Sequence, residues 1–394
     1  MKRIGILTGG GDVPPLNALI ASVQQEATKK NIEVIGFIKG WAGVLEKQYV
    51  PLSSLKINPS IGGTVLKSSR VNLRKVHEGP ARVLQNLKEM NVQGLLVIGG
   101  EDTLSNSFYL PGLPQILISK TIDNDIGIMP LDEDKVLSDD IVNYFTLGFP
   151  TAAARISSFV SLQEGLRTTA YSHERILIVE SMGMHAGWLA ISSAMGHPDF
   201  IIIPEFPVKC DELAKLIAER YEKERNAIVV VAEGARWEDG SYMSANEGDG
   251  DDFGHPRFKG SAETLAKILR GHLDDQFCLR NLNAVNPSYL YRSGSPVELD
   301  RLCSSQLARK AIQIISEGLN EAVFLSIRKD DRRFECHAIP LQSYPDISHL
   351  YRLVDQRFYN SKSFSITEVG IEYMSAIVKD IPLCISYGIG QLRV

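Results

Sequence analysis

Five short turns carry the residues that are best suited to chemistry, and each follows a run of apolar residues. They are Thr8–Asp12, Gly99–Thr103, Lys120–Asp125, Ser181–Gly183 and Glu233–Gly234. In the first turn, three consecutive glycines allow positive φ angles and let backbone N–H groups approach an anion closely. The helix expected after Pro14 or Pro15 directs its positive end to the same place. This turn therefore predicts a phosphate-binding loop, although it matches neither a Walker A loop nor the Gly-x-Gly-x-x-Gly motif.

The second and third turns add carboxylates to the expected phosphate site. These acids are Glu101, Asp102, Asp123 and Asp125. Four negative charges close together repel one another unless a divalent cation lies among them, and Mg²⁺ accepts oxygen ligands while it bridges phosphate oxygens. Lys120 supplies a positive charge at the start of the third turn. An anion loop, a lysine and acids that serve as metal ligand and as base together indicate phosphoryl transfer to a hydroxyl group.

The elements that position these turns alternate between short Val/Ile-rich runs and longer helical patterns. Strands are expected over Arg3–Thr8, Glu33–Ile38, Gly94–Ile98, Gln115–Ile118, Arg175–Glu180, Phe200–Ile203, Ala227–Val231 and Ala322–Ile327. Helices are expected over Leu16–Lys30, Ala81–Met90, Ala152–Leu166, Asp211–Lys223, Ala262–Leu273 and Ser305–Ser316. This alternation predicts a mostly parallel sheet with helices on both faces. Since the carboxyl ends of parallel strands lie along one edge, the five turns are expected to be neighbours in space.

Composition excludes several classes of protein. The chain has 394 residues, which predicts about two to three domains. It has 42 basic and 47 acidic residues, so it offers no basic field for a nucleic acid or a membrane surface. Its apolar runs fall short of the about 20 residues that a membrane span needs, and we expect a cytoplasmic protein. Five scattered cysteines without a Cys-x-x-Cys pair indicate neither a disulfide framework nor a zinc site.

Two stretches interrupt the alternation and are interpreted as surface excursions. They are Ile128–Tyr144 and the acidic stretch Trp237–Lys259. The second lacks the glutamate that would close a calcium-binding loop, so a solvated acidic loop is the preferred interpretation. The sequence from about Lys329 onward suggests no role.

The ordered motifs resemble the phosphofructokinase family over about Lys2–Ile327. They are Gly9–Ala18 (GGGDVPPLNA), Gly99–Thr103 (GGEDT), Lys120–Asp125 (KTIDND), Thr146–Ala152 (TLGFPTA), Ser172–Gly187 (SHERILIVESMGMHAG), Glu233-Gly234 and Tyr291–Arg301 (YRSGSPVELDR). The resemblance implies an α/β fold of two Rossmann-like lobes with mostly parallel sheets and an active site in the cleft between them. It implies a donor lobe over residues 1–150 and a sugar-phosphate lobe over 151–330, with the chain crossing between them. Residues 331–394 remain as an extension of unknown role.

The resemblance also implies roles for residues around the donor. Asp123 matches the general base that takes the proton from the sugar 1-hydroxyl, with Thr121 and Asp125 beside it. Arg70 matches an arginine that bridges the donor and the sugar phosphate. Glu101 stands where the family commonly has a magnesium-binding aspartate, so Mg²⁺ is the implied cofactor. The implied donor-binding residues are Gly10, Gly11, Asp102, Thr103 and Lys120.

A second set of residues matches the family's sugar-phosphate contacts. It comprises Thr121, Arg175, Met182, Gly183, Glu233, Tyr289 and Arg292. Arg175 matches an arginine that reaches a sugar phosphate across a subunit interface. The resemblance therefore implies a homo-oligomer, either a dimer or a tetramer.

Two positions favour pyrophosphate over ATP as the donor. Members of the family that use ATP usually have glycine at the positions of Asp102 and Lys120. The Asp102 side chain would place bulk and negative charge where a nucleotide must pass, and Lys120 would offer an ammonium group to the free end of pyrophosphate. The resemblance then implies transfer from pyrophosphate to the 1-hydroxyl of fructose 6-phosphate, which is readily reversible. ATP remains the alternative donor.

Several departures from the family pattern leave further alternatives open. Met184 replaces a usual arginine, Pro150 an aspartate and Asn283 an arginine, while Tyr289 replaces a histidine and Ser288 a glycine. A different or longer sugar phosphate, such as a sedoheptulose phosphate, is one alternative. A regulatory subunit that binds a sugar phosphate with little catalysis is the other.

Overall fold

The chain folds into two compact units that are each built from more than one stretch of sequence. The computed structural model describes residues 3–127, 143–246, 258–273, 281–330, 333–344, 346 and 351–381. The first unit holds the described parts of 1–151 and 292–352, and the second holds those of 152–249, 256–291 and 353–394. The chain thus passes from one unit to the other after residues 151, 291 and 352. These units differ from the expected ranges 1–150, 151–330 and 331–394, because the described parts of 292–352 belong to the first unit and those of 353–394 to the second.

The first unit contains an eight-stranded sheet in the order β14-β13-β5-β4-β1-β2-β3, with β6 paired to the end of β5. Its strands are β1 (Arg3–Thr8), β2 (Glu33–Phe37), β3 (Tyr49–Pro51), β4 (Leu95–Gly99), β5 (Gln115–Thr121), β6 (Leu147–Gly148), β13 (Ala322–Asp330) and β14 (Arg333–Pro340). The central pairs are parallel, whereas β3 and β14 are antiparallel to their neighbours. Strands β4 and β5 and the central residues of β13 are buried on both faces, which explains their continuous apolar character.

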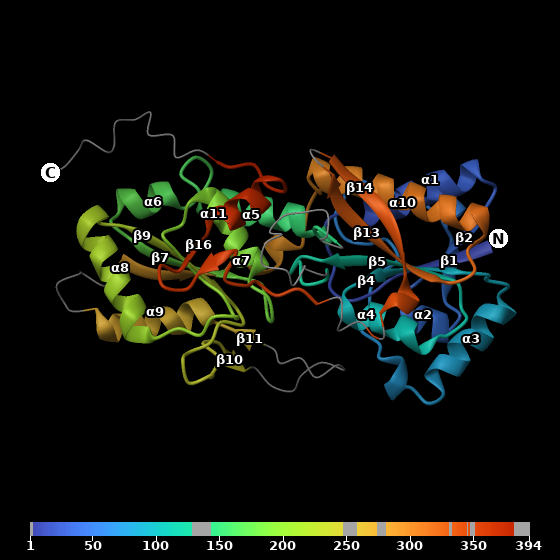
Figure 1. Ribbon diagram of the computed structural model, residues 1–394, viewed down its shortest axis with the longest axis horizontal. Coiled ribbons are helices and arrows are strands. Elements are labelled where there is room, and N and C mark those ends of the chain that lie inside the picture. Colours follow the sequence, from blue (N-terminus) through green and yellow to red (C-terminus); the bar gives the residue numbers. More distant parts are fainter. Residues whose placement is uncertain are drawn as a thin grey trace. The chain divides into compact units, whose positions relative to one another are not determined.

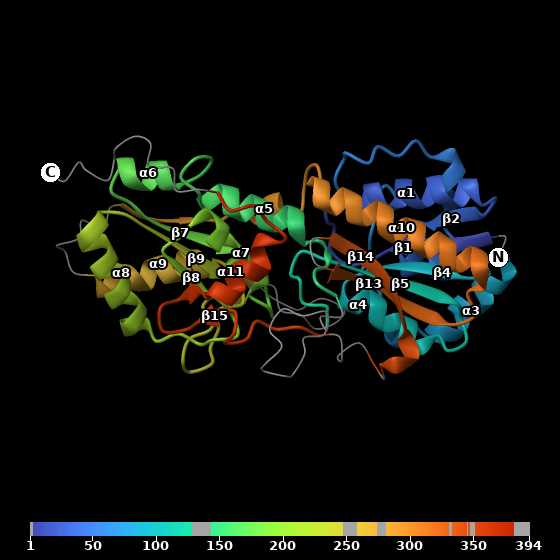
Figure 2. The same ribbon diagram turned by 45° about the horizontal axis from the view of Figure 1, so that its top comes forward.

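Helices cover both faces of this sheet. They are α1 (Leu16–Lys29), α2 (Trp41–Leu45), α3 (Gly79–Glu89), α4 (Glu101–Ser105) and α10 (Glu298–Gly318). Figures 1 and 2 show α1 and α10 together on one side of the sheet and α2, α3 and α4 on the other. Each connection from β1 to α1 and from β4 to α4 is a short turn, so the glycine-rich and acidic motifs lie where the strands end.

The second unit is built on a parallel four-stranded sheet in the order β12-β7-β9-β8. These strands are β7 (Ile176–Ser181), β8 (Phe200–Ile202), β9 (Ala227–Ala232) and β12 (Leu282–Val285). Two short antiparallel pairs join β10 (Ala245–Asn246) to β11 (Phe258–Lys259), and β15 (Tyr359–Asn360) to β16 (Ser365–Ile366). The helices are α5 (Phe149–Val160), which starts in the first unit, α6 (Arg167–Ser172), α7 (Trp188–Ser192), α8 (Cys210–Glu224), α9 (Ser261–His272) and α11 (Glu368–Ser375).

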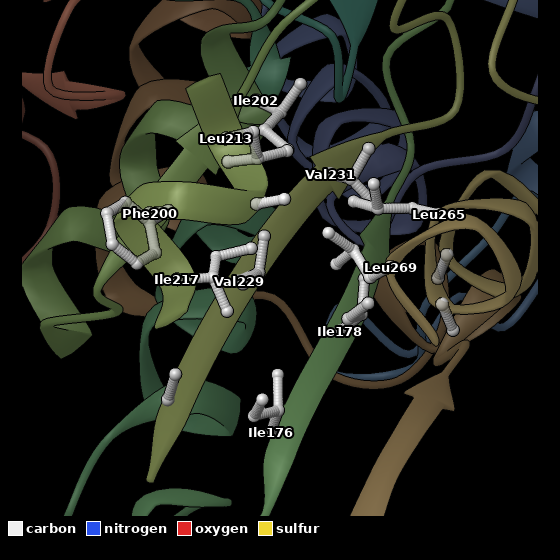
Figure 3. Close-up of a cluster of buried hydrophobic side chains, with 14 of the residues drawn as sticks. Ile176, Ile178, Phe200, Ile202, Leu213, Ile217, Val229, Val231, Leu265 and Leu269 are labelled. Carbon is white, nitrogen blue, oxygen red and sulfur yellow. The ribbon is translucent and has the colours of Figure 1, made fainter. Parts of the chain in front are cut away.

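The core of the second unit follows from the two-residue period of its strands. Alternate residues such as Ile176 and Ile178, or Val229 and Val231, point to the same side of the sheet. They meet Leu213 and other apolar residues of α8 and α9, and Figure 3 shows this cluster. A well-packed core of this kind holds the strand ends, and the turns that follow them, in fixed positions.

The expected elements are all present, with small shifts at their ends. The helix expected over Ala152–Leu166 runs instead over Phe149–Val160. It begins earlier because the buried Asp300 carboxylate accepts hydrogen bonds from the Gly148 and Thr151 backbone N–H groups and caps this end. The helix expected over Ser305–Ser316 is longer at both ends. Residues 128–142 and 247–257, within the two expected surface excursions, lie outside the described residues. Within the described ranges, no helix is long and apolar enough to cross a bilayer.

Candidate functional site

Three of the five turns meet at one edge of the first sheet. Strands β5, β4 and β1 are consecutive in the sheet and parallel, so their carboxyl ends coincide. Thr8 pairs with Ile98, and Gly99 pairs with Ser119. The glycine turn, the Glu101 turn and the Asp123 turn are therefore direct neighbours, as the parallel-sheet interpretation predicts.

The glycine turn lies so close to its neighbours that side chains would not fit. A Cβ at Gly9 would be 2.4 Å from the Thr103 hydroxyl, and Gly10 has a positive φ of 76°. The Gly10 N–H donates to the Ser69 carbonyl at 3.1 Å, and the Ser68 hydroxyl donates to the Gly10 carbonyl at 2.5 Å. The turn is thus held between the start of α4 and the segment that carries Arg70, next to the start of α1.

Lys120 is buried beneath this glycine turn. Its side chain is only 2% exposed, and its ammonium group donates a hydrogen bond to the Gly11 carbonyl. Burial and the positive charge of Arg292 lower the pKa of Lys120 to about 7, although the negative charges of Asp12 and Asp123 act in the opposite direction. A buried amine with two arginines near it forms a concentration of positive groups that is suited to receive an anionic ligand.

The two arginines near Lys120 come from distant parts of the sequence. A Cβ at Gly11 would be 2.2 Å from Nη1 of Arg292, so this guanidinium lies directly against the glycine turn. Arg70 also lowers the pKa of Lys120 through its charge. Both arginines were expected to contact phosphate groups. The structure brings Arg292, expected among the sugar contacts, to the expected donor loop.

The Asp123 turn carries two carboxylates with unused hydrogen-bonding capacity. The Thr121 hydroxyl donates to one oxygen of Asp123 at 3.2 Å and accepts from the Asp123 N–H at 3.1 Å. Oδ1 of Asp123 and Oδ1 of Asp125 are buried and accept no hydrogen bond from the described residues. Burial and the charge of Asp123 raise the pKa of Asp125 to about 7. An acceptor that is oriented by Thr121 and left open on its other oxygen is suited to take a proton from a bound hydroxyl.

Glu101 and Asp102 occupy the first turn of α4, beside the Asp123 turn. The negative charge of Glu101 contributes to the raised pKa of Asp125, and its carboxylate is hydrogen-bonded to the Tyr351 phenol. Partial burial, this hydrogen bond and the surrounding carboxylates raise the pKa of Tyr351, whose residue is 41% exposed.

The donor set of this edge fits Mg²⁺ that arrives with a phosphate ligand. Oδ1 of Asp125 is buried and lacks a partner among the described residues, and the carboxylate of Glu101 is near enough for its charge to act on Asp125. The described residues contain no group of three His, Cys, Asp or Glu side chains arranged to hold a metal by themselves. Mg²⁺ commonly binds through one or two carboxylates together with substrate phosphates, so the two observations agree.

The second unit brings Met182, Gly183 and Glu233 together at the carboxyl ends of β7 and β9. Ser181 pairs with Ala232 at the end of the two strands. The Gly183 N–H donates to a Glu233 carboxylate oxygen at 3.2 Å. These three residues were expected to contact the sugar, and they form one cluster. Gly234 packs against the chain at Met184, where a Cβ would be 1.9 Å from the carbonyl oxygen.

Arg175 lies at the opposite end of β7 from this cluster. It precedes Ile176, and its guanidinium donates to the Thr169 hydroxyl at 2.7 Å. The length of β7, roughly 20 Å, separates it from Met182. Tyr289 follows β12 and is 73% exposed. The structure therefore brings neither side chain into contact with the Met182 cluster, and their expected roles stay predictions.

Three residues around the Asp123 and glycine turns were not among the expected site residues. The negative charge of Asp12 acts to raise the pKa of Lys120. Its place directly after three glycines could have indicated a site residue. Tyr351 and Arg352 contact the Glu101 and Asp123 turns from a distant segment. No pattern in the sequence connects this segment with those turns.

The chain is similar to known proteins of one family. The pattern of the family described as Phosphofructokinase matches residues 3–315. The pyrophosphate–fructose 6-phosphate 1-phosphotransferase of Dictyoglomus thermophilum is 38% identical over 335 residues, which cover 84% of this chain and 90% of that protein. The ATP-dependent 6-phosphofructokinase 3 of Streptomyces coelicolor is 37% identical over 323 residues, which cover 80% of this chain and 88% of that protein. Relatives of nearly equal identity are thus named for different donors.

Solved structures confirm the fold. The crystal structure of a pyrophosphate-dependent phosphofructokinase from Marinobacter aquaeolei has a TM-score of 0.76 at 18% identity, and the similarity covers 97% of this chain and 93% of that one. This likeness confirms the α/β fold with mostly parallel sheets. Together with the match of the sequence pattern and the identity to curated relatives, it shows that the chain belongs to the phosphofructokinase family.

Proposed function

We propose that the chain transfers a phosphoryl group from inorganic pyrophosphate to the 1-hydroxyl of fructose 6-phosphate. In this reaction the hydroxyl oxygen forms a bond to the terminal phosphorus, and the bond between that phosphorus and the bridging oxygen breaks. The electron pair of the broken bond leaves with inorganic phosphate. The hydroxyl proton passes to Asp123. The reaction is expected to run in both directions, as pyrophosphate and the sugar ester are of similar energy.

The buried ammonium group of Lys120 is the observation that carries the choice of donor. It lies under the Gly9–Gly11 turn, hydrogen-bonded to the Gly11 carbonyl and near the positive charges of Arg70 and Arg292. A small, highly charged diphosphate matches this compact positive site. Asp102 supports the same choice, since relatives that use ATP usually have glycine there and at Lys120.

Asp123 is the proposed general base, oriented by the Thr121 hydroxyl. Its second oxygen is buried and without a partner among the described residues, so it is available to accept a proton. Lys120, Arg70, Arg292 and the N–H groups of the glycine turn would stabilise negative charge as it moves to the leaving phosphate. Glu101 and Asp125 would hold Mg²⁺, which neutralises charge on phosphate oxygens when it is bound.

The sugar phosphate is proposed to bind the cluster formed by Met182, Gly183 and Glu233. Arg175 is proposed to serve the sugar phosphate of another subunit, because it lies at the other end of β7. This part of the proposal requires a dimer or a tetramer. Sedimentation of the purified chain tests it, and a monomer that is fully active contradicts it.

A matrix of donors against acceptors tests the whole proposal. Pyrophosphate and ATP are each combined with fructose 6-phosphate and with sedoheptulose 7-phosphate, and the kcat/KM of each pair is measured. We expect pyrophosphate with fructose 6-phosphate to give the highest value. The similar identity to a relative named ATP-dependent supports ATP as the second candidate, and turnover with ATP but not with pyrophosphate would replace the first.

Replacement of the proposed base separates an enzyme from a binding subunit. Asp123→Asn should lower kcat by about two to four orders of magnitude, because it removes the proton acceptor and retains the shape of the side chain. Asp239→Asn, in an exposed loop, is the matched control and should retain full activity. Sugar-phosphate binding with no turnover in the natural sequence, whatever the donor, would favour a regulatory subunit.

A further inference from the structure

A short segment near the carboxyl end contacts the turn that carries the proposed base. It consists of Tyr351 and Arg352, and it lies beyond residue 315, where the family match ends. Tyr351 forms an antiparallel bridge with Ile126, and the Arg352 N–H donates to the Asp125 carbonyl at 2.8 Å. The segment thus runs alongside residues 124–126 and extends the backbone hydrogen bonding of this turn.

Arg352 binds the inner side of the turn through its guanidinium group. The side chain is 1% exposed, and it donates to the Asn124 carbonyl at 2.9 and 3.2 Å and to the Asn124 side-chain oxygen at 2.5 Å. It also donates to the carbonyls of Asn143 at 2.7 Å and Tyr144 at 3.0 Å. A planar group with several donors fixes the relative position of all the carbonyls that it contacts.

Asn124 has a left-handed backbone conformation that these hydrogen bonds hold in place. Its φ of 56° lies in a region that residues other than glycine adopt uncommonly, although asparagine does so more readily than most. Its side-chain oxygen also accepts the Thr146 N–H at 3.0 Å. Asn124 separates Asp123 from Asp125, so its conformation determines the directions in which the two carboxylates point.

Gly127 leaves the space that Arg352 occupies. A Cβ at this position would be 3.3 Å from the guanidinium carbon of Arg352 and 2.6 Å from the Asn143 carbonyl oxygen. Tyr351 adds a contact on the other side of the site, where its phenol is hydrogen-bonded to the Glu101 carboxylate. One dipeptide therefore reaches both the turn of the proposed base and the proposed metal ligand.

We propose that Tyr351 and Arg352 are positioning residues for phosphoryl transfer: Arg352 holds the Asp123–Asp125 turn in its reactive conformation, and Tyr351 orients the Glu101 carboxylate. The inference rests on the proposed function for the identity of the base. Misplacement of a reacting group by about 1 Å can lower a rate about 100-fold, so loss of this support should act on kcat. Binding of the sugar phosphate, which is proposed to use the second unit, should change little.

Hydrogen exchange of the full chain, without any substrate, tests the support of the turn. Arg352→Met should exchange at least tenfold faster than the natural sequence in peptides that span residues 121–127. Arg167→Met is the matched control, because Arg167 is also buried and contacts Asp199, Asn226 and the His197 carbonyl in the second unit. Unchanged exchange of the turn in Arg352→Met, or an equal increase in Arg167→Met, would overturn the proposal. This result does not depend on whether the proposed donor or sugar is correct.

Steady-state kinetics tests the consequence for catalysis. Arg352→Met should lower kcat about 100-fold with less than a threefold change in the KM for fructose 6-phosphate, and Arg352→Lys should recover part of the loss. Tyr351→Phe removes only the hydroxyl group and should lower kcat about tenfold. Tyr359→Phe is the control: it removes a buried hydroxyl that donates to the Ile201 carbonyl, and it should leave kcat unchanged. If Arg352→Met does not fold, Tyr351→Phe still decides. A normal kcat in Tyr351→Phe, or a loss of equal size in Tyr359→Phe, would contradict the proposed role.

Discussion

Replacement of Lys120 by methionine should change stability and donor use in opposite directions. The lysine is buried, and burial together with Arg292 lowers its pKa from 10.5 to about 7. A shift of this size corresponds to about 5 kcal/mol of unfavourable free energy in the folded protein whenever the amine is charged. Methionine has a similar length and no charge, so Lys120→Met removes this cost. It also removes the hydrogen bond to the Gly11 carbonyl, which costs about 1–3 kcal/mol.

The sign of the pH dependence follows from the lowered pKa. Below pH 7 the amine is charged in the folded and unfolded chains, and the full cost is present. Between pH 7 and pH 10.5 the unfolded chain binds the proton and the folded chain does not, so the stability of the natural sequence rises by about 1.4 kcal/mol per pH unit. Lys120→Met should therefore be more stable than the natural sequence by about 2–4 kcal/mol at pH 6, and this difference should decrease by about 3 kcal/mol by pH 9.

Urea unfolding of the ligand-free protein at pH 6 and pH 9 measures this difference. Lys88→Met is the control, because Lys88 is exposed on α3 and its replacement should have the same small effect at both pH values. An advantage of Lys120→Met that is identical at the two pH values would refute the reasoning. It would mean that the amine keeps an ordinary pKa in its buried position.

Donor use should respond in the opposite way. Loss of a charged contact to phosphate costs about 1.5–3 kcal/mol, so Lys120→Met should lower kcat/KM for pyrophosphate about 10- to 150-fold at pH 6.5. The kcat/KM of the natural sequence divided by that of Lys120→Met should fall about tenfold per pH unit above pH 7, where Lys120 loses its proton, until the two proteins are equal. Ionisation of pyrophosphate itself affects both proteins equally and cancels in this ratio. A constant ratio between pH 6 and pH 9 would show that Lys120 does not titrate there.

Three further variants test the arrangement of the turns. Gly11→Ala places a Cβ 2.2 Å from the Arg292 guanidinium. The arginine side chain can move away, so we expect little loss of stability but a kcat/KM that is at least tenfold lower. Unchanged kinetics would contradict the role of Arg292. Gly234→Ala places a Cβ 1.9 Å from the Met184 carbonyl and should destabilise the protein by about 1–3 kcal/mol in urea unfolding, and equal stability would contradict the packing. Asp102→Gly combined with Lys120→Gly should raise the preference for ATP over pyrophosphate at least tenfold, and a preference that does not change would show that these positions do not select the donor.

The sequence predicts much of the architecture and most of the turns because both depend on local patterns. Continuous apolar runs such as Ala227–Val231 must be buried on both faces, and they alternate with amphipathic helices, so a parallel sheet is the expected result. Parallel strands share one carboxyl edge, and this geometry alone places the glycine turn beside Glu101 and Asp123. The motif from Lys120 to Asp125 spans only six residues, so its side chains must lie close together wherever the end of this strand lies.

Residues that reach the site from a distance could not be predicted in this way. The chain returns to the first unit at Arg292, ahead of α10, β13 and β14, and passes to the second unit after Arg352, and no local pattern encodes these crossings. Arg292 lies against Gly11, although the intervening chain is about 280 residues long. A contact of this kind is decided by the packing of whole elements, which fixes where each strand and helix ends.

The sequence alone therefore determined the order of the strands and helices, the position of the glycine turn that is predicted to bind phosphate, and the acids that accompany it. Only the tertiary structure showed that Lys120 is buried below that turn and that Arg352 contacts Asn124 from 228 residues away. Burial and charge density are properties of the folded environment, because they depend on which residues exclude water and which charges remain close. The shifted pKa values of Lys120 and Asp125 belong to this second class.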